Sequence, residues 1–194
     1  LVLRLSGLNL FRHRRGLAAF VVEDRASAAD LEDLAAAHRA GALERWLAVQ
    51  PKWDVIHFNW GLHDLKHMKP AAPKPTTSAD PNDPPLHSVA EYRANLEKIV
   101  TRLQRTGARL IFATTTPVPE GVQNPFRNPN DPSLYNAAAI ELMKSQGIRV
   151  NDLYAFIQPR VAGLQLPQNV HFTDRGSEAL AGQVATAIIT QLAT

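Results

Sequence analysis

The chain contains no cysteine, so disulfide bonds, thiolate nucleophiles and cysteine-based zinc sites are excluded. It also lacks any apolar run approaching the roughly 18 residues that cross a membrane, and we expect no membrane span. A cysteine-free chain suits oxidising and reducing surroundings alike, which leaves the compartment open. The sequence gives no indication of an oligomeric state either.

The chain also has no large excess of charge of one sign. It contains 21 Lys and Arg and 18 Asp and Glu, which gives a net charge of +3. The basic residues cluster only at Arg12–Arg15. A phosphate or nucleic-acid contact there is one interpretation, but no aromatic residues are interleaved and no basic helix face accompanies the cluster. A solvated surface cluster fits better, and we expect no nucleic-acid partner.

The remaining composition, 45% hydrophobic and 20% charged over 194 residues, is that of one globular domain with a sizeable core. Short apolar runs alternate with amphipathic segments, which predicts strands over residues 1–5, 18–22, 54–59, 109–115 and 148–150 and helices over residues 28–48, 88–106, 133–146 and 173–192. Strands separated by helices need crossover connections. The sequence therefore predicts a three-layer α/β sandwich with a mostly parallel sheet.

A histidine lies in a short, stiff segment just before the last predicted helix, in the sequence Leu166–Gly176. A general base needs a fixed backbone and a side chain that can take up a proton, and the imidazole of His171 in this segment is a candidate. The alternative is a loop histidine that caps the helix or bonds a carbonyl.

Polar residues also follow the predicted strand 54–59, in the run Asn-Trp-Gly-Leu-His-Asp that ends at Asp64. Ligands of parallel sheets bind beyond the carboxyl ends of the strands. Gly61 permits a tight turn, while Asn59 and His63 can donate hydrogen bonds to an oxygen that develops negative charge. The alternative is a simple strand-to-helix turn.

With these segments the chain resembles the SGNH (GDSL-type) hydrolases, flavodoxin-like α/β enzymes that cleave esters, including acetyl groups on carbohydrates. The family's Gly-x-Asn-Asp block corresponds to Gly61–Asp64, and its Asp-x-x-His block corresponds to Gln168–His171. The strand and loop ending in Thr114–Pro119 are also similar. The resemblance begins at Trp53 and continues to the last residue.

The resemblance implies a serine-type carboxylic ester hydrolase that acts on short acyl esters of small molecules and needs no cofactor. His171 would be the general base, and Gly61 with His63 or Asn59 would form the oxyanion hole. His63 stands where the family has asparagine. Gln168 stands where it has aspartate, and a glutamine can accept a hydrogen bond from the imidazole but cannot stabilise the imidazolium by charge.

The N-terminal part departs most from the family, because no Gly-Asp precedes a serine there. Ser6 follows the first predicted strand and is the candidate nucleophile, with Ser27 next. We expect one domain over residues 1–194 in which residues 1–48 are atypical. Our hypothesis is that this segment diverged from the family or was altered by a shifted reading frame.

Two proline-rich stretches, residues 70–85 and 117–132, predict long surface loops. Each follows a predicted strand, so we expect both to overhang the site. The residues expected to contact substrate there are Trp60, Met68 and Phe126 as an apolar wall, and Asn124, Arg127 and Asn130 as polar contacts. The alternative is a scaffold role distant from the site.

Two other functions stay open. A metal-dependent hydrolase would use His63 and His67, four residues apart, with His57 and His171 as further ligands. A descendant without catalysis would bind an ester or glycan and leave it intact. Metal analysis of the purified protein tests the first alternative, and p-nitrophenyl acetate hydrolysis with and without a serine-directed phosphonate tests the second.

Overall fold

A computed structural model describes residues 2–5, 8–12, 18–22, 42–49, 51–71, 75–121 and 124–193. The strands are β1 (Val2–Leu5), β2 (Leu8–Arg12), β3 (Ala18–Val22), β4 (Val55–Phe58), β5 (Met68–Lys69), β6 (Thr76–Thr77), β7 (Arg109–Ala113) and β8 (Arg149–Asn151). The helices are α2 (Ala42–Leu47), α3 (Val89–Gln104), α4 (Asp131–Ser145), α5 (Leu153–Ile157), the 3-10 helix η1 (Gln158–Arg160) and α6 (Asp174–Ala193).

The central sheet has the strand order β1-β2-β3-β4-β7-β8. The last four strands of that order pair in parallel, and only β1–β2 and β2–β3 pair antiparallel. All four residues of β4 are buried, as are four of the five in β7. Continuous burial is what a parallel strand covered on both faces requires, so the predicted mostly parallel sheet is confirmed.

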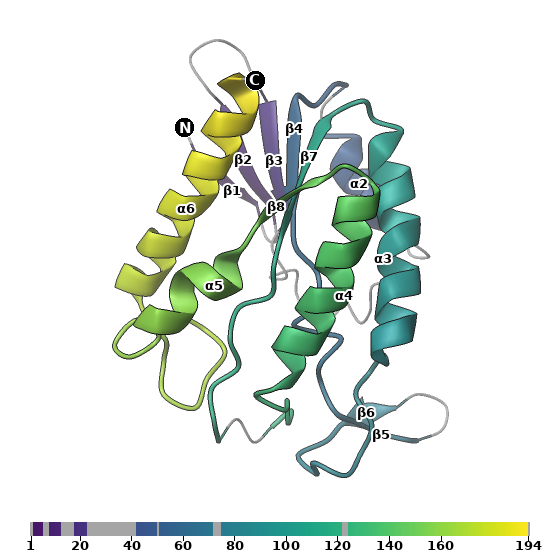
Figure 1. Cartoon of the computed structure of the whole chain (residues 1–194), viewed down its shortest axis with the longest axis vertical. Coiled ribbons are helices and arrows are strands. Elements are labelled where there is room, and N and C mark those ends of the chain that lie inside the picture. The colour runs from purple at the N-terminus through teal and green to yellow at the C-terminus, as the bar shows by residue number, and fades with distance from the viewer. Residues whose placement is uncertain are drawn as a thin grey trace.

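Two hydrophobic clusters lie on the two faces of this sheet, because successive side chains of a strand point to opposite sides. Ile56 and Phe58 pack with α2, α3 and α4, whereas Val55 packs with α5 and α6. Figure 1 shows α3 and α4 on one side of the sheet and α5 and α6 on the other. The architecture is the predicted three-layer α/β sandwich.

Hydrogen-bonded caps begin the two helices that lead away from the loops. Ser88 Oγ accepts from the backbone N–H of Glu91, and the Glu91 carboxylate accepts from the backbone N–H of Ser88, which is a complete capping box. Thr173 Oγ1 accepts from the backbone N–H of Gly176 at 3.2 Å. Both predicted helix starts are confirmed.

Several elements differ from the sequence prediction. β2 was not expected, and it makes the N-terminal part an antiparallel meander with Leu5 opposite Leu8. The proline-rich loop is not free of regular structure, since Thr76–Thr77 pairs with Met68–Lys69 at a stretch without proline. Of the predicted helix 28–48, residues 42–47 are helical, and most of the remainder lies outside the described residues.

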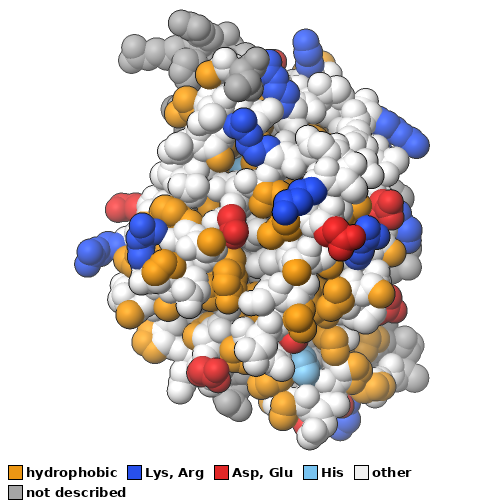
Figure 2. All heavy atoms as spheres, in the orientation of Figure 1, with side chains coloured by type: hydrophobic (Ala, Val, Ile, Leu, Met, Phe, Trp, Pro, Cys, Tyr) orange, Lys and Arg blue, Asp and Glu red, His pale blue; other side chains and the backbone are white. Residues whose placement is uncertain are grey.

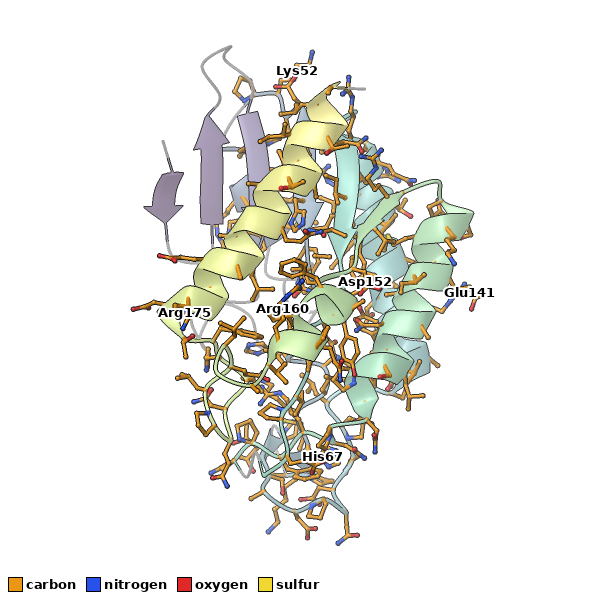
Figure 3. The ribbon with its side chains drawn as sticks, turned by 60° about the vertical axis from the view of Figure 1, so that its left-hand side comes forward. Lys52, His67, Glu141, Asp152, Arg160 and Arg175 are labelled. Carbon is orange, nitrogen blue, oxygen red and sulfur yellow. The ribbon has the colours of Figure 1, made fainter. Side chains whose placement is uncertain are left out.

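The parallel strands β4, β7 and β8 end at one edge of the sheet, which we call the carboxyl edge. The helices α3 and α6 begin there, and the proline-rich loops project from it (Figure 1). Lys52, just before β4, and His67, after it, lie at opposite ends of the molecule (Figure 3). None of the helices seen in the described ranges is both long and apolar enough to span a membrane.

Candidate active site

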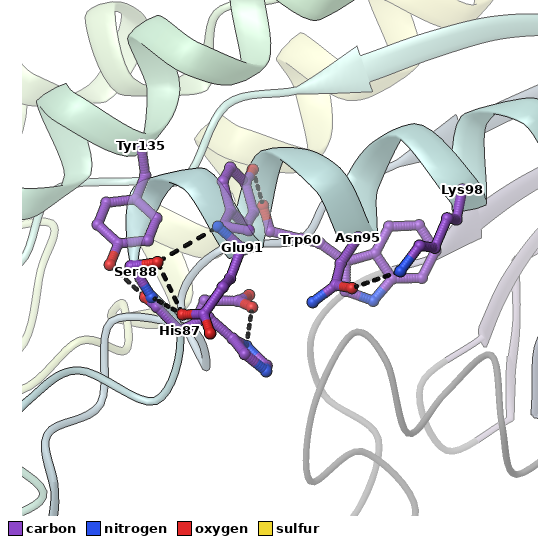
Figure 4. Close-up of polar contacts among 9 residues, drawn as sticks. Trp60, His87, Ser88, Glu91, Asn95, Lys98 and Tyr135 are labelled. Atoms are coloured by element: carbon purple, nitrogen blue, oxygen red, sulfur yellow. Dashed lines mark hydrogen bonds and ion pairs between the residues drawn. The ribbon is translucent and has the colours of Figure 1, made fainter.

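A glycine turn follows β4 at the carboxyl edge. Gly61 has φ +147°, and a Cβ placed on it would lie 2.2 Å from Thr115 Oγ1, beyond the end of β7. No larger residue fits this conformation and this close approach. The Thr115 hydroxyl donates to the Trp60 carbonyl at 3.3 Å. The Tyr92 hydroxyl donates to the same carbonyl at 2.9 Å (Figure 4).

These two bonds orient the peptide between Trp60 and Gly61. In a trans peptide the C=O and N–H point in opposite directions. With the Trp60 carbonyl facing the two hydroxyls, the Gly61 N–H points away from them, and it has no hydrogen-bond partner among the residues described. A backbone N–H fixed in this way is the kind of donor that stabilises an oxyanion.

Of the other two oxyanion candidates, Asn59 already uses part of its donor capacity. Asn59 is half-buried, and its Nδ2 donates to the Ala113 carbonyl at 2.8 Å, joining the ends of β4 and β7. That bond uses one of its two N–H groups. His63 is also half-buried, and its carbonyl accepts from the backbone N–H of Lys66 at 3.2 Å.

Burial corrects two of the expected substrate contacts. The Trp60 side chain is 4% exposed and packs beside Phe58 in the hydrophobic core, so it forms no wall for a ligand. Arg127 is 6% exposed, and its Nε donates to the Leu62 carbonyl at 2.8 Å. Arg127 therefore fixes the turn that contains Gly61.

The two proline-rich loops are joined through their backbones. The N–H of His67 donates to the Phe126 carbonyl, that of Phe126 to the Ser78 carbonyl, and that of Ser78 to the His67 carbonyl, at 2.9, 2.8 and 2.9 Å. The Phe126 ring also meets the His67 ring edge-on at 4.7 Å and stays half-buried. The expectation that these loops overhang the site stays a prediction.

His171 is exposed, and its ring is held by a residue two positions earlier in the chain. Its Nδ1 lies 2.6 Å from Asn169 Oδ1, and the same oxygen accepts from the His171 backbone N–H at 2.9 Å. The His171 carbonyl accepts from the backbone N–H of Leu166 at 2.9 Å, which closes the loop. Sequence reasoning looked to Gln168 for the ring's partner and missed Asn169.

This loop is anchored on the segment after β7. Gln165 is buried, and its Nε2 donates to the Pro117 carbonyl at 2.8 Å. Gln168 has φ 52°, and its side chain lies against Gly121, 3.2 Å from the place a Cβ would take there. Val170 packs on the larger hydrophobic cluster. These contacts hold His171 at the carboxyl edge.

A second imidazole at this edge was not expected. His87 Nδ1 lies 2.8 Å from Oδ1 of Asp64, a carboxylate that is 1% exposed, and the Tyr135 hydroxyl donates to the His87 carbonyl (Figure 4). The available signal was the aspartate of the Gly61–Asp64 block together with a histidine directly before the capping Ser88. Charge and geometry make His87 a second candidate base.

Ser6 and Ser27 both lie outside the described residues. β1 is parallel to β3 and β4, so it does end at the carboxyl edge, but it stands three strand positions from β4. At the usual spacing of neighbouring strands this is roughly 14 Å. The strand beside β4 is β3, which argues for a nucleophile that follows β3 over one that follows β1.

The metal alternative finds no support in the arrangement. In the parts of the chain that the structure describes, no three side chains of His, Asp or Glu gather as ligands. His57 is 1% exposed, its Nε2 lies 3.1 Å from Asn151 Nδ2, and burial lowers its pKa to about 4. The ring of His67 is turned against Phe126.

A mostly parallel three-layer sandwich, with a glycine turn after a central strand and a histidine loop before the last helix, defines a class of α/β hydrolases. A family model described as the GDSL-like lipase/acylhydrolase family matches residues 12–179, and the chain belongs to this family. The match begins after Ser6.

Solved structures show the same fold at low sequence identity. A lipase/acylhydrolase from Enterococcus faecalis is 20% identical, with a TM-score of 0.59 over 81% of this chain and 71% of that one. The acetyl xylan esterase AlAXEase is 14% identical, with a TM-score of 0.60 over 80% and 76%. An acetylxylan esterase from Geobacillus stearothermophilus is 16% identical, with a TM-score of 0.55 over 79% and 66%. No curated protein matches significantly.

Proposed function

We propose that this protein is a serine-type hydrolase of short acyl esters in which His171 is the general base. The observation that carries the proposal is the His171 ring, held by Asn169 in a loop anchored at the carboxyl edge of an acylhydrolase fold. The names of two similar structures, both acetyl xylan esterases, support a small acyl group such as acetyl.

The reaction proceeds in two steps. Nε2 of His171 takes the proton of the serine hydroxyl as its oxygen attacks the ester carbonyl carbon. The negative oxygen of the tetrahedral intermediate accepts from the Gly61 N–H and from His63 or Asn59. The alcohol leaves with the proton from Nε2, and the acyl group stays bonded to the serine oxygen. Nε2 then takes a proton from the water that attacks the acyl carbon, and it returns this proton to the serine oxygen as the acid leaves.

The substrate is a small, mainly apolar ester on this proposal. Figure 2 shows the molecule in the orientation of Figure 1. On this face, apolar side chains gather in the lower half, toward the carboxyl edge, and most Lys and Arg lie above them or at the sides. The half-buried ring of Phe126 is the contact proposed for the acyl or alcohol group. No cofactor takes part.

The test uses p-nitrophenyl acetate hydrolysis with variants of both histidines at the carboxyl edge. We expect His171→Ala to lower kcat by about a hundredfold or more, because an unactivated hydroxyl is a poor nucleophile. His87→Gln tests the second candidate base and should retain most of the activity if His171 is the base. The assignment is wrong if the two results are reversed.

Labelling with a serine-directed phosphonate, followed by peptide mapping, identifies the nucleophile. Ser6 and Ser27 are the candidates, and the sheet order favours Ser27. A stoichiometric label that disappears in His171→Ala supports a serine hydrolase. Absence of both label and turnover would instead favour a protein that binds esters or glycans without cleaving them.

A further inference from the structure

We propose that Asn169 is the positioning residue of His171 and fills the role that the resemblance assigned to the position of Gln168. The inference rests on the proposed function in one respect, namely that His171 acts as a base. The state of the His171 ring can be measured whether or not the protein hydrolyses an ester.

The amide orientation of Asn169 follows from its second contact. The His171 backbone N–H can only donate, so the atom of Asn169 that faces it at 2.9 Å must be the amide oxygen. That same oxygen lies 2.6 Å from Nδ1 of the ring. Because an amide oxygen only accepts, Nδ1 must carry the proton.

A proton on Nδ1 leaves the lone pair of the neutral ring on Nε2. This is the tautomer that accepts a proton from a serine hydroxyl, and the wrong tautomer is what disables a triad when its orienting residue is changed. The Asx-type turn from Asn169 to His171 thus fixes the backbone and the ring through a single oxygen.

Gln168 is directed elsewhere. Its backbone has φ 52°, and its Cγ and Nε2 lie 3.2 Å from where a Cβ of Gly121 would stand. The chain therefore places an acceptor on the ring one residue later than the resemblance predicts. Gln168 serves as the matched control for Asn169.

Asn169 also differs from an aspartate because it is neutral. A carboxylate beside the ring favours its protonated form. An amide holds the ring without adding a charge beside it. In Asn169→Asp the acid limb of the kcat/KM profile should consequently move to higher pH.

The experiment compares Asn169→Ala, Asn169→Asp and Gln168→Ala with the unchanged protein. Nitrogen-15 spectra of the His171 side chain report the tautomer of the neutral ring, and ester hydrolysis across pH reports the base. We expect Asn169→Ala to lose the Nδ1–H tautomer and to lower kcat about tenfold or more with little change in KM. Asn169→Asp and Gln168→Ala should both keep the Nδ1–H tautomer.

The inference is overturned if Asn169→Ala keeps the Nδ1–H tautomer, or if Gln168→Ala is the variant that loses it. Failure of the proposed function looks different. In that case the unchanged protein has no esterase activity, while the tautomer still follows Asn169. An unshifted acid limb in an active Asn169→Asp variant would count against the role of Asn169 even with normal folding.

Discussion

Buried His57 should make the protein lose stability in mild acid. The ring lies under α6 on one face of the sheet, 1% exposed, and burial lowers its pKa to about 4 from the ordinary 6.5. Its hydrogen bond also belongs to the neutral form. Gln183 Nε2 donates to Asn151 Oδ1 at 3.1 Å, which leaves the Asn151 amide nitrogen to donate to Nε2 of the ring.

The direction and size of this change in the free energy of unfolding follow from proton linkage. The unfolded chain binds a proton on His57 below pH 6.5, whereas the folded state resists it down to pH 4. The stabilisation from the neutral ring is complete above pH 6.5, decreases as the pH falls, and is fully lost below pH 4. A shift of this size corresponds to about 3 kcal/mol in all, of which about 2 kcal/mol is gone by pH 5.

Urea unfolding followed by tryptophan fluorescence from pH 8 to pH 4 measures this effect. The control is His57→Gln, whose side-chain oxygen can accept from Asn151 and which does not titrate. This variant starts less stable but should lose about 2 kcal/mol less than the unchanged protein between pH 8 and pH 5. Parallel curves for the two proteins would refute the reasoning, since all other titrating groups are common to both.

Three substitutions test the packing of the site. Gly61→Ala should destabilise the protein by about 2 kcal/mol or more in urea unfolding and abolish ester hydrolysis, because its Cβ meets Thr115 Oγ1; wild-type stability would show that the turn rearranges freely. Ser88→Ala should lower the unfolding free energy by about 1 kcal/mol and leave kcat unchanged, and a loss of kcat would place the cap in the site. Arg127→Met should cost about 1–3 kcal/mol and raise KM, since the Leu62 carbonyl loses its donor; an unchanged melting temperature would contradict this.

Local sequence signals predicted the layers of this fold well. The strands β4 and β7 were recognisable because a parallel strand covered on both faces is apolar without alternation. The helix starts were recognisable because Ser88 and Thr173 bond to backbone groups only three residues away. In each case the physical cause acts within a few residues, where the sequence records it directly.

The missed features depend on contacts that sequence spacing does not record. Arg127 was expected at the surface, as most arginines are, but it lies buried beneath a turn 65 residues earlier in the chain. The role of Asn169 depends on the rotation of one amide, and Gln168 was the closer match to the family pattern. The burial of Trp60 depends on the hydrophobic core that packs beside it, including the Phe58 ring.

The ring of backbone hydrogen bonds among His67, Ser78 and Phe126 has a consequence for motion at the carboxyl edge. Each of the three residues gives one bond and receives one, so neither proline-rich loop can lift away without breaking bonds of the other. The two loops therefore form one cooperative unit, and their fluctuations should be correlated. On the prediction that these loops overhang the site, a substrate could enter only when both open together.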